Sequence, residues 1–270
     1  ALRDMGLLDF DEPFLRFYSQ GVIIHKKAKM SKSRGNVVTP DPYVEELGAD
    51  AVRCYLMFVG PWDLGGEWDH SGISGIARWF NRVWDMVLRD PKELPNPSQR
   101  EGLADAAAQR ETERWVHKSI KRVTEDIERF RFNTMLAGLM EFTNYLADAW
   151  EAKKVSSDEW RKAIETLLLL LAPSAPHMAE ELWERTGHAY SIHNQPFPKW
   201  DEALVSEEEI TVVVQVNGKV RDKLTVPASV SESEAKELAL ASPKVKAHLG
   251  DGVVARVIYV PQRLVNIVTG

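Results

Sequence analysis

The chain has 270 residues, of which 44% are hydrophobic and 27% charged, so it is long enough for two or three domains and its composition argues against general disorder. Its net charge of −6 excludes a general polyanion-binding protein, and its single cysteine, Cys54, excludes an internal disulfide and a cysteine-rich zinc site and fits a reducing cytoplasm. The longest apolar run, at 167–172, is too short to cross a bilayer, and the N-terminus has no signal-peptide pattern, so no membrane association is expected.

The first predicted elements surround a dense basic loop. The apolar run GVIIH at 21–25 predicts a buried strand, which leads directly into the loop KKAKMSKSRGN at 26–36. Short helices are predicted next, at 41–47 and 49–59, because apolar residues recur at helical spacing and glycine or proline follows each stretch. The stretch 60–69, which is rich in glycine and tryptophan, predicts an ordered loop.

Helical periodicity dominates the middle of the chain, where apolar residues recur three and four positions apart. Helices are predicted at 70–88, 116–130, 135–150, 160–171 and 176–187. A proline-rich break at 90–97 separates the first of these helices from the second. The pattern is typical of an antiparallel bundle of four or five helices.

The pattern changes after a linker at 189–205. Two runs with β-branched residues flank Asn217 and Gly218, which predicts a hairpin with a two-residue type I′ turn. A capping box predicts that a helix starts at Ser231. Two further strands are predicted, at 253–260 and 263–268. The last residues therefore form a small α+β module.

This C-terminal module is more basic than the rest of the chain. Residues 210–270 carry eight Lys and Arg against five Asp and Glu, although the whole chain is acidic. The excess favours an anionic partner for the module. The alternative is a chance fluctuation of a few charges, which explains the same numbers.

The loop at 26–36 has the chemistry of a phosphate site. The ammonium groups of Lys29 and Lys32 can surround a polyphosphate and follow its charge as a bond breaks. Gly35 allows a tight turn, and Ser31 and Ser33 add small hydrogen-bond donors. A nucleotide phosphate is the expected anion, and a solvated basic loop is the alternative.

Residues 29–33 read KMSKS, which resembles the signature loop of the class I aminoacyl-tRNA synthetases. PDPYVEELGADAVRCYLMF at 40–58 and SGISGIARWFNRVW at 71–84 are similar to the segments that follow this loop in the leucine, isoleucine, valine and methionine members. VVVQVNGKVRDKLTVP at 212–227 and VIYVPQRLVNIV at 257–268 resemble the C-terminal domain of the bacterial leucyl-tRNA synthetases.

Three other members of this group fit less well. The valyl members end in a helical coiled coil, and the isoleucyl and methionyl members often hold zinc through cysteines that Cys54 alone cannot supply. The resemblance therefore implies the C-terminal portion of a leucyl-tRNA synthetase of bacterial type.

The resemblance implies a mainly α fold in three parts. Residues 1–69 would be the end of a class I catalytic domain with the KMSKS loop. Residues 70–204 would be a helical bundle of the anticodon-binding type, and residues 205–270 a C-terminal α+β domain that binds tRNA.

The resemblance also implies the chemistry, which is ATP-dependent activation of leucine and its transfer to tRNA(Leu). Lys29 and Lys32 would be catalytic, with Lys32 stabilising charge on the leaving pyrophosphate. The ATP-binding residues would be Lys29, Met30, Ser31, Lys32 and Ser33. ATP would be a substrate and bring Mg²⁺, and leucine would bind through an N-terminal part that these residues lack, since the family's H-I-G-H signature is absent from them. The expected enzyme is a cytoplasmic monomer.

The hairpin supplies the candidate tRNA-binding residues. In a regular two-residue hairpin Lys219, Arg221 and Lys223 share a face with Val212 and Val214. Their stems could cover these valines while the charged heads reach phosphate. Either face of the hairpin remains open as the core face.

The remaining candidates are weaker. His70, His177 and His193 share no ligand spacing, so no metal site is predicted. Trp62 and Trp68 remain open between stacking on bases and packing. The tryptophans at helical spacing are expected in the core: Trp79, Trp84, Trp115, Trp150, Trp160 and Trp183. A basic helix edge that acids interleave is a weak tRNA signal: Lys118, Lys121, Arg122, Arg129 and Arg131.

Two further functional hypotheses stay open. One is a free-standing, non-catalytic tRNA-binding module, and the other is a fragment of the isoleucyl or valyl relative. The intact KMSKS loop favours part of an enzyme, because a pure binding module has no need of an ATP loop.

Overall fold

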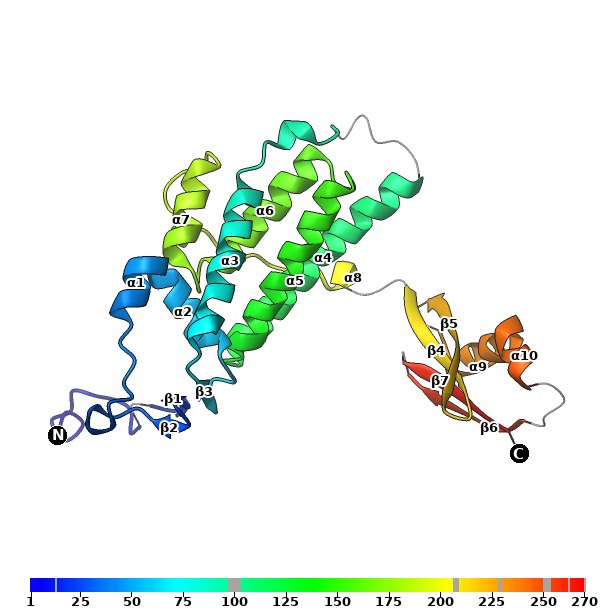
Figure 1. Cartoon of the computed structure of the whole chain (residues 1–270), viewed down its shortest axis with the longest axis horizontal. Coiled ribbons are helices and arrows are strands. Elements are labelled where there is room, and N and C mark those ends of the chain that lie inside the picture. The colour runs from blue at the N-terminus through cyan, green and yellow to red at the C-terminus, as the bar shows by residue number, and fades with distance from the viewer. Residues whose placement is uncertain are drawn as a thin grey trace. The chain divides into compact units, whose positions relative to one another are not determined.

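The computed structural model describes residues 1–12, 14–96, 103–205, 209–227, 230–249, 254–261 and 263–269 (Figure 1). Its contacts divide the chain into two compact units, Ala1–Trp200 and Asp201–Gly270, and each is treated separately below. The end of the predicted proline-rich break and the first residue of the strand predicted at 253–260 lie outside the described residues.

The first unit begins with a small three-stranded sheet. The predicted strand before the basic loop is β1 (Val22–His25), and it lies in the centre of the order β2–β1–β3. β2 (Ala28–Lys29) pairs with it antiparallel, and β3 (Gly65–Glu67) pairs with it parallel. The predicted loop at 60–69 thus contains a strand, which the sequence did not indicate because two of its three residues are glycines.

Gly65 explains how β3 comes so close to β1. Its φ is +76°, and a Cβ atom added there would lie 2.3 Å from the carbonyl oxygen of Val22. Glycine is therefore required here for both its conformation and its lack of a side chain.

The predicted helices follow in the predicted order, which confirms a mainly α fold. They are α1 (Asp41–Leu47), α2 (Ala49–Phe58), α3 (His70–Val87), α4 (Leu103–Glu128), α5 (Phe132–Glu151), α6 (Ser157–Leu171) and α7 (Pro176–Arg185). Figure 1 shows α3, α4, α5 and α6 running side by side. The linker after α7 contains a short 3₁₀ turn, η4 (Ile192–Asn194), and the single-turn helix α8 (Glu202–Val205).

Helix α4 is longer than predicted. Its apolar stripe starts at Val116, but the helix itself starts at Leu103 because the alanine-rich stretch at 104–108 has high helix propensity. Its predicted last residue, Phe130, lies in the turn to α5 with a φ of +55°.

The bundle encloses one continuous apolar core. The inner face of α5 is completely buried at Leu136, Leu139, Phe142 and Leu146. Burial of each such side chain contributes about 1.5–3 kcal/mol. The same core includes residues of α2 and α3, so the helices that follow the basic loop are packed into the bundle.

After α8, the described residues of the second unit form a four-stranded sheet with two helices, as the α+β prediction requires. Its elements are β4 (Glu209–Val216), β5 (Lys219–Pro227), α9 (Glu232–Ala241), α10 (Pro243–Leu249), β6 (Val254–Val260) and β7 (Leu264–Thr269). The strand order is β5–β4–β7–β6, with β4 and β7 parallel. Asn217 and Gly218 both have positive φ, which confirms the predicted type I′ turn.

The register of this hairpin corrects the prediction for its cations. Val216 pairs with Lys219 as expected, but beyond it Val214 pairs with Asp222 and Val213 with Lys223. Arg221 is therefore the extra residue of a β-bulge. The buried valines of β4 are Val212, Val214 and Val216. Since Val213 points away from these, Lys223 lies on the opposite face and cannot cover Val212.

No helix within the described parts of the chain is long and apolar enough to cross a membrane.

Candidate functional site

The basic loop folds as a tight hairpin followed by a 3₁₀ turn. Lys26 and Lys27 connect β1 to β2 with φ values of 55° and 58°, the left-handed conformation of a two-residue hairpin turn. The backbone N–H of Lys27 donates to Glu67 Oε1 of β3 at 2.9 Å. This turn was not predicted because such turns normally contain asparagine or glycine.

The two candidate catalytic lysines lie on either side of the bend. Lys29 ends β2, and Lys32 begins the 3₁₀ turn η1 (Lys32–Arg34). Both side chains are exposed, and neither forms an ion pair with any residue that the structure describes. Their charges are therefore available to an anion.

The other motif residues shape the loop. Met30 is half-buried and packs against the core of the first unit, so it anchors the motif from below. The hydroxyls of Ser31 and Ser33 lie 2.8 Å apart, within hydrogen-bond distance. Gly35 ends the turn in the left-handed conformation, with a φ of +64°.

Asn36 is the residue that the sequence reasoning missed. Its side chain is buried beneath the loop and accepts a hydrogen bond from the backbone N–H of Ser31 at 2.9 Å. Its Nδ2 donates to the carbonyl oxygens of His25 at 3.1 Å and Lys29 at 3.3 Å. What distinguishes Asn36 is the burial of a polar side chain directly after an exposed turn. Burial of this kind cannot be seen in the sequence alone.

An aromatic cluster lies beside the base of the loop. Tyr43 Oη and Trp68 Nε1 both bond to Nδ1 of His70, the latter at 3.4 Å. The indole N–H of Trp68 can only donate, so this ring nitrogen accepts from it. Burial raises the pKa of Tyr55, whose hydroxyl accepts from the backbone N–H of Asp69 at 2.7 Å.

The two loop tryptophans are part of this packing. Trp68 is buried in the core, and Trp62 is half-buried with its ring edge-on to Phe132 at 5.1 Å. Burial accounts for Trp68, whereas part of the Trp62 ring stays exposed.

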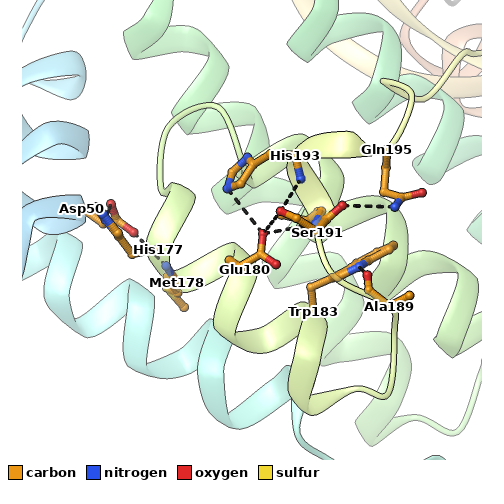
Figure 2. A network of polar contacts seen from close by, with 10 residues as sticks. Asp50, His177, Met178, Glu180, Trp183, Ala189, Ser191, His193 and Gln195 are labelled. Carbon is orange, nitrogen blue, oxygen red and sulfur yellow. Dashed lines mark hydrogen bonds and ion pairs between the residues drawn. The ribbon is translucent and has the colours of Figure 1, made fainter.

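Asp50 ties α2 to the start of α7. Figure 2 shows its carboxylate against His177 and Met178. It accepts from the backbone N–H of Met178 at 2.8 Å, from His177 at 2.9 Å and from Arg53 at 2.5 Å. This carboxylate is satisfied by hydrogen bonds and holds two helices together.

Glu180 does the same for the turn after α7. Its Oε2 accepts from the hydroxyl of Ser191 and from the backbone N–H of Ile192, and His193 lies beside it (Figure 2). His177 and His193 thus pair with different carboxylates. The described residues include no cluster of three or more histidine, cysteine or acidic side chains that could hold a metal ion.

The basic edge of α4 is largely neutralised. Arg122 pairs with Glu141, Arg129 with Glu125, and Arg131 with Asp126. Lys118 lies over the ring of Trp115 at 5.5 Å. The tryptophans at helical spacing are buried or packed against the core, as predicted.

The hairpin cations differ in their surroundings. Lys219 and Lys223 are exposed, whereas Arg221 is half-buried and its Nε has no hydrogen-bond partner among the described residues. Between them, Asp222 is bonded to Ser242 and Lys244, and these bonds lower the pKa of the carboxyl to about 2. The structure therefore leaves two of the three candidate cations fully available to an anion.

Two known families match separate parts of the chain. Residues 6–63 match the family described as tRNA synthetases class I (I, L, M and V). Residues 110–236 match the anticodon-binding domain of tRNA ligase. The first match contains the basic loop, and the second covers most of the bundle.

Other relatives match the whole chain. Over 268 residues, 99% of this chain, the sequence is 56% identical to a leucine–tRNA ligase of Dehalococcoides mccartyi strain 195. Over 269 residues it is 51% identical to that of Rubrobacter xylanophilus. Over its whole length the chain is therefore similar to leucine–tRNA ligases. It spans 32% of the length of these two relatives and matches their C-terminal part.

A solved structure has the same fold. It is the ternary complex of Agrobacterium radiobacter K84 agnB2 LeuRS with tRNA and LeuAMS, which matches with a TM-score of 0.80 and 35% identity. The match covers 100% of this chain and 35% of that one. These relatives support the leucyl rather than the isoleucyl or valyl assignment.

Proposed function

We propose that this chain is the part of a leucine–tRNA ligase that supplies the ATP loop and the tRNA-binding surfaces. The complete enzyme would activate leucine with ATP and transfer it to tRNA(Leu), and leucine itself would bind outside these residues. The observation that carries the proposal is the pair of exposed ammonium groups at Lys29 and Lys32, which form no ion pair with any described residue. They lie on a loop whose sequence matches the class I family.

The loop would act by electrostatics. As the leucine carboxylate attacks the α-phosphorus of ATP, the bond to pyrophosphate breaks and negative charge accumulates on the leaving group. Lys32, with Lys29 beside it, stabilises this charge without any proton transfer. Met30, Ser31 and Ser33 shape the loop around the phosphates.

Mg²⁺ would enter with the nucleotide as part of the substrate. Magnesium bound to ATP is held mainly by the phosphates, and one or two carboxylates are sufficient on the protein side. The enzyme is proposed to act as a cytoplasmic monomer, which fits a single buried cysteine, Cys54, whose pKa burial raises to about 12.

The second unit would hold tRNA by its backbone. Lys219 and Lys223, which are exposed, would meet phosphates, and Arg221 would add a third contact if its side chain turns outward. Such contacts read shape and charge rather than base edges, because the deep groove of A-form RNA hides its bases.

Substitution of the loop lysine tests the enzymatic role. In the full-length enzyme, Lys32→Ala is expected to slow leucine-dependent pyrophosphate exchange by about 100- to 1,000-fold and to leave tRNA affinity unchanged, because Lys32 serves charge that develops in the transition state. Lys162→Ala, which removes an exposed cation of α6, is the matched control. Exchange at the wild-type rate in the Lys32 variant would show that this loop does not serve the activation step.

A further inference from the structure

Asn36 is the buried polar centre of the loop that carries the catalytic lysines. Its residue exposure is 7%, while its neighbours Gly35 and Val37 are exposed. The side chain points under the hairpin, where its amide meets backbone from three places: the end of β1, the end of β2 and the middle of the KMSKS motif.

The orientation of this amide is determined by its partners. Oδ1 faces the N–H of Ser31, which is a donor, and Nδ2 faces carbonyl oxygens, which are acceptors. The reverse orientation would place two donors together and an oxygen against carbonyls. The two N–H groups of Nδ2 are directed at the carbonyl oxygens of His25, at 3.1 Å, and Lys29, at 3.3 Å. The carbonyl oxygen of Ala28 lies at 3.5 Å, the limit for a hydrogen bond, so no third donor is needed.

These bonds fix the backbone on both sides of Met30. The carbonyl of Lys29 and the N–H of Ser31 both end on one side chain, which itself bonds back to His25, eleven residues earlier. The turn at Lys32 starts directly from this anchored point, because Arg34 N–H donates to the carbonyl of Ser31 at 3.1 Å. Asn36, which is buried beneath the loop, therefore anchors the backbone from which both lysine side chains extend.

We propose that Asn36 is a positioning residue for leucine activation, which holds Lys29 and Lys32 in the geometry that stabilises the leaving pyrophosphate. This inference rests on the proposed function of the loop. Asn36 does not touch ATP in this role and acts through the loop backbone. Small displacements of charged groups matter in such a site, because a shift of about 1 Å can lower a rate about 100-fold.

The test uses the full-length enzyme and pyrophosphate exchange. Asn36→Ala is expected to lower kcat by about 100-fold, because the lysines no longer meet the charge of the transition state. The KM for leucine and the affinity for tRNA are expected to stay at wild-type values, because neither ligand is held by the loop. Asn81→Ala removes an exposed amide of α3 and is the matched control.

A second variant adds a pH readout that a purely structural role does not produce. Asn36→Asp keeps an acceptor for Ser31 but sets a buried carboxylate against carbonyl oxygens, so its pKa should be raised. At about pH 8 it should be slower than Asn36→Ala, and its kcat relative to wild type should recover toward about pH 6, where the protonated carboxyl can donate to a carbonyl.

The outcomes separate this inference from the proposed function. A normal kcat for Asn36→Ala, together with a large loss for Lys32→Ala, overturns only the positioning role. A normal rate for Lys32→Ala overturns the proposed function as well. Should Asn36→Ala fail to fold, the pH profile of Asn36→Asp decides, and a kcat ratio to wild type that does not change with pH overturns the positioning role.

Discussion

Lys29 and Lys32 are three residues apart, but their backbones are held by different partners. The carbonyl of Lys29 accepts from Asn36, which is buried, whereas the carbonyl of Lys32 accepts from the N–H of Gly35 within the exposed turn. Asn36 therefore holds the backbone of Lys29 directly and that of Lys32 through the turn that starts at Ser31.

Gly65 gives a prediction about stability at the same scale. Gly65→Ala should reduce the free energy of unfolding by more than about 1–3 kcal/mol, since it adds a steric clash with Val22 to the cost of a left-handed alanine. Urea unfolding of the 270-residue chain, followed by tryptophan fluorescence, measures this loss.

Gly187→Ala is the control for the clash. Gly187 also has a positive φ, of +88°, but no atom lies within 4 Å of an added Cβ. The two variants share the conformational cost, so the Gly65 variant should be the less stable one. Equal losses would show that β3 moves away from β1 without cost.

Asp222 gives a prediction about pH. Hydrogen bonds from Ser242 and Lys244 depress its pKa in the folded state to about 2, so the carboxylate stabilises the second unit at pH values above its ordinary pKa. This stabilisation should be lost as the pH falls from about 4 to about 2.

Hydrogen exchange checks this prediction. At about pH 5 the amides of β5 and α10 should exchange faster in Asp222→Asn than in the wild type, and the difference should shrink toward about pH 2. A difference that stays constant over this range would assign the effect to lost packing rather than to charge.

At the scale of elements, periodicity predicted the helices well and the short strands poorly. The helices α3, α5 and α6 carry apolar residues at regular spacing, and burial of that face makes the pattern visible in the sequence. Strand β3 and the turn between β1 and β2 are held by backbone contacts of glycines and lysines, which leave no apolar pattern. Asn36 was missed for the same reason, because its partners are backbone atoms.

The bulge at Arg221 shows a different limit. The turn residues Asn217 and Gly218 predicted the hairpin and its first pair correctly. The extra residue Arg221 then moved the side chains of the following positions to the opposite face of the sheet. No residue type in β5 predicts this bulge. Face assignments from alternation hold only as far as the nearest bulge.

The hairpin also carries a prediction for tRNA binding. Replacing Lys219, Arg221 and Lys223 by Gln in the full-length enzyme should weaken tRNA binding and reduce the log–log salt slope by roughly one for each lost phosphate contact. Lys219 and Lys223 are exposed, so their single substitutions should each account for more of this change than that of Arg221.

Lys236→Gln is the control, since Lys236 is already paired with Glu232 on α9 at 2.6 Å. Pyrophosphate exchange without tRNA should stay normal in all these variants. An unchanged affinity and salt slope in the triple variant would leave these cations as solvated edge charges.

For the whole molecule, we expect the isolated 270-residue chain to fold and to make no leucyl-adenylate. Each unit has its own apolar core, but the H-I-G-H half of the ATP site is absent from these residues. Circular dichroism and pyrophosphate exchange on highly purified chain check the two parts. Measurable exchange would mean that the loop and its neighbours suffice for activation.

The N-terminal residues suggest how the isolated chain will behave in solution. Large apolar side chains there are exposed, among them Met5, Phe14, Leu15 and Phe17. A cluster of exposed apolar residues favours association, so the chain alone should form oligomers as its concentration rises. Light scattering over a concentration series measures this directly.

The two apolar cores also determine where related genes could exchange segments. One core joins Ala51 and Tyr55 of α2 to Ile73 and Ile76 of α3, whereas the core of the second unit draws its residues from beyond position 201. A crossover between two related genes near residue 69 would combine α2 from one protein with α3 from the other, and these two halves of the core have not been selected to pack together. A crossover near residue 201 would leave both cores intact, so recombination can replace the C-terminal module while the ATP loop and its bundle are inherited as one block.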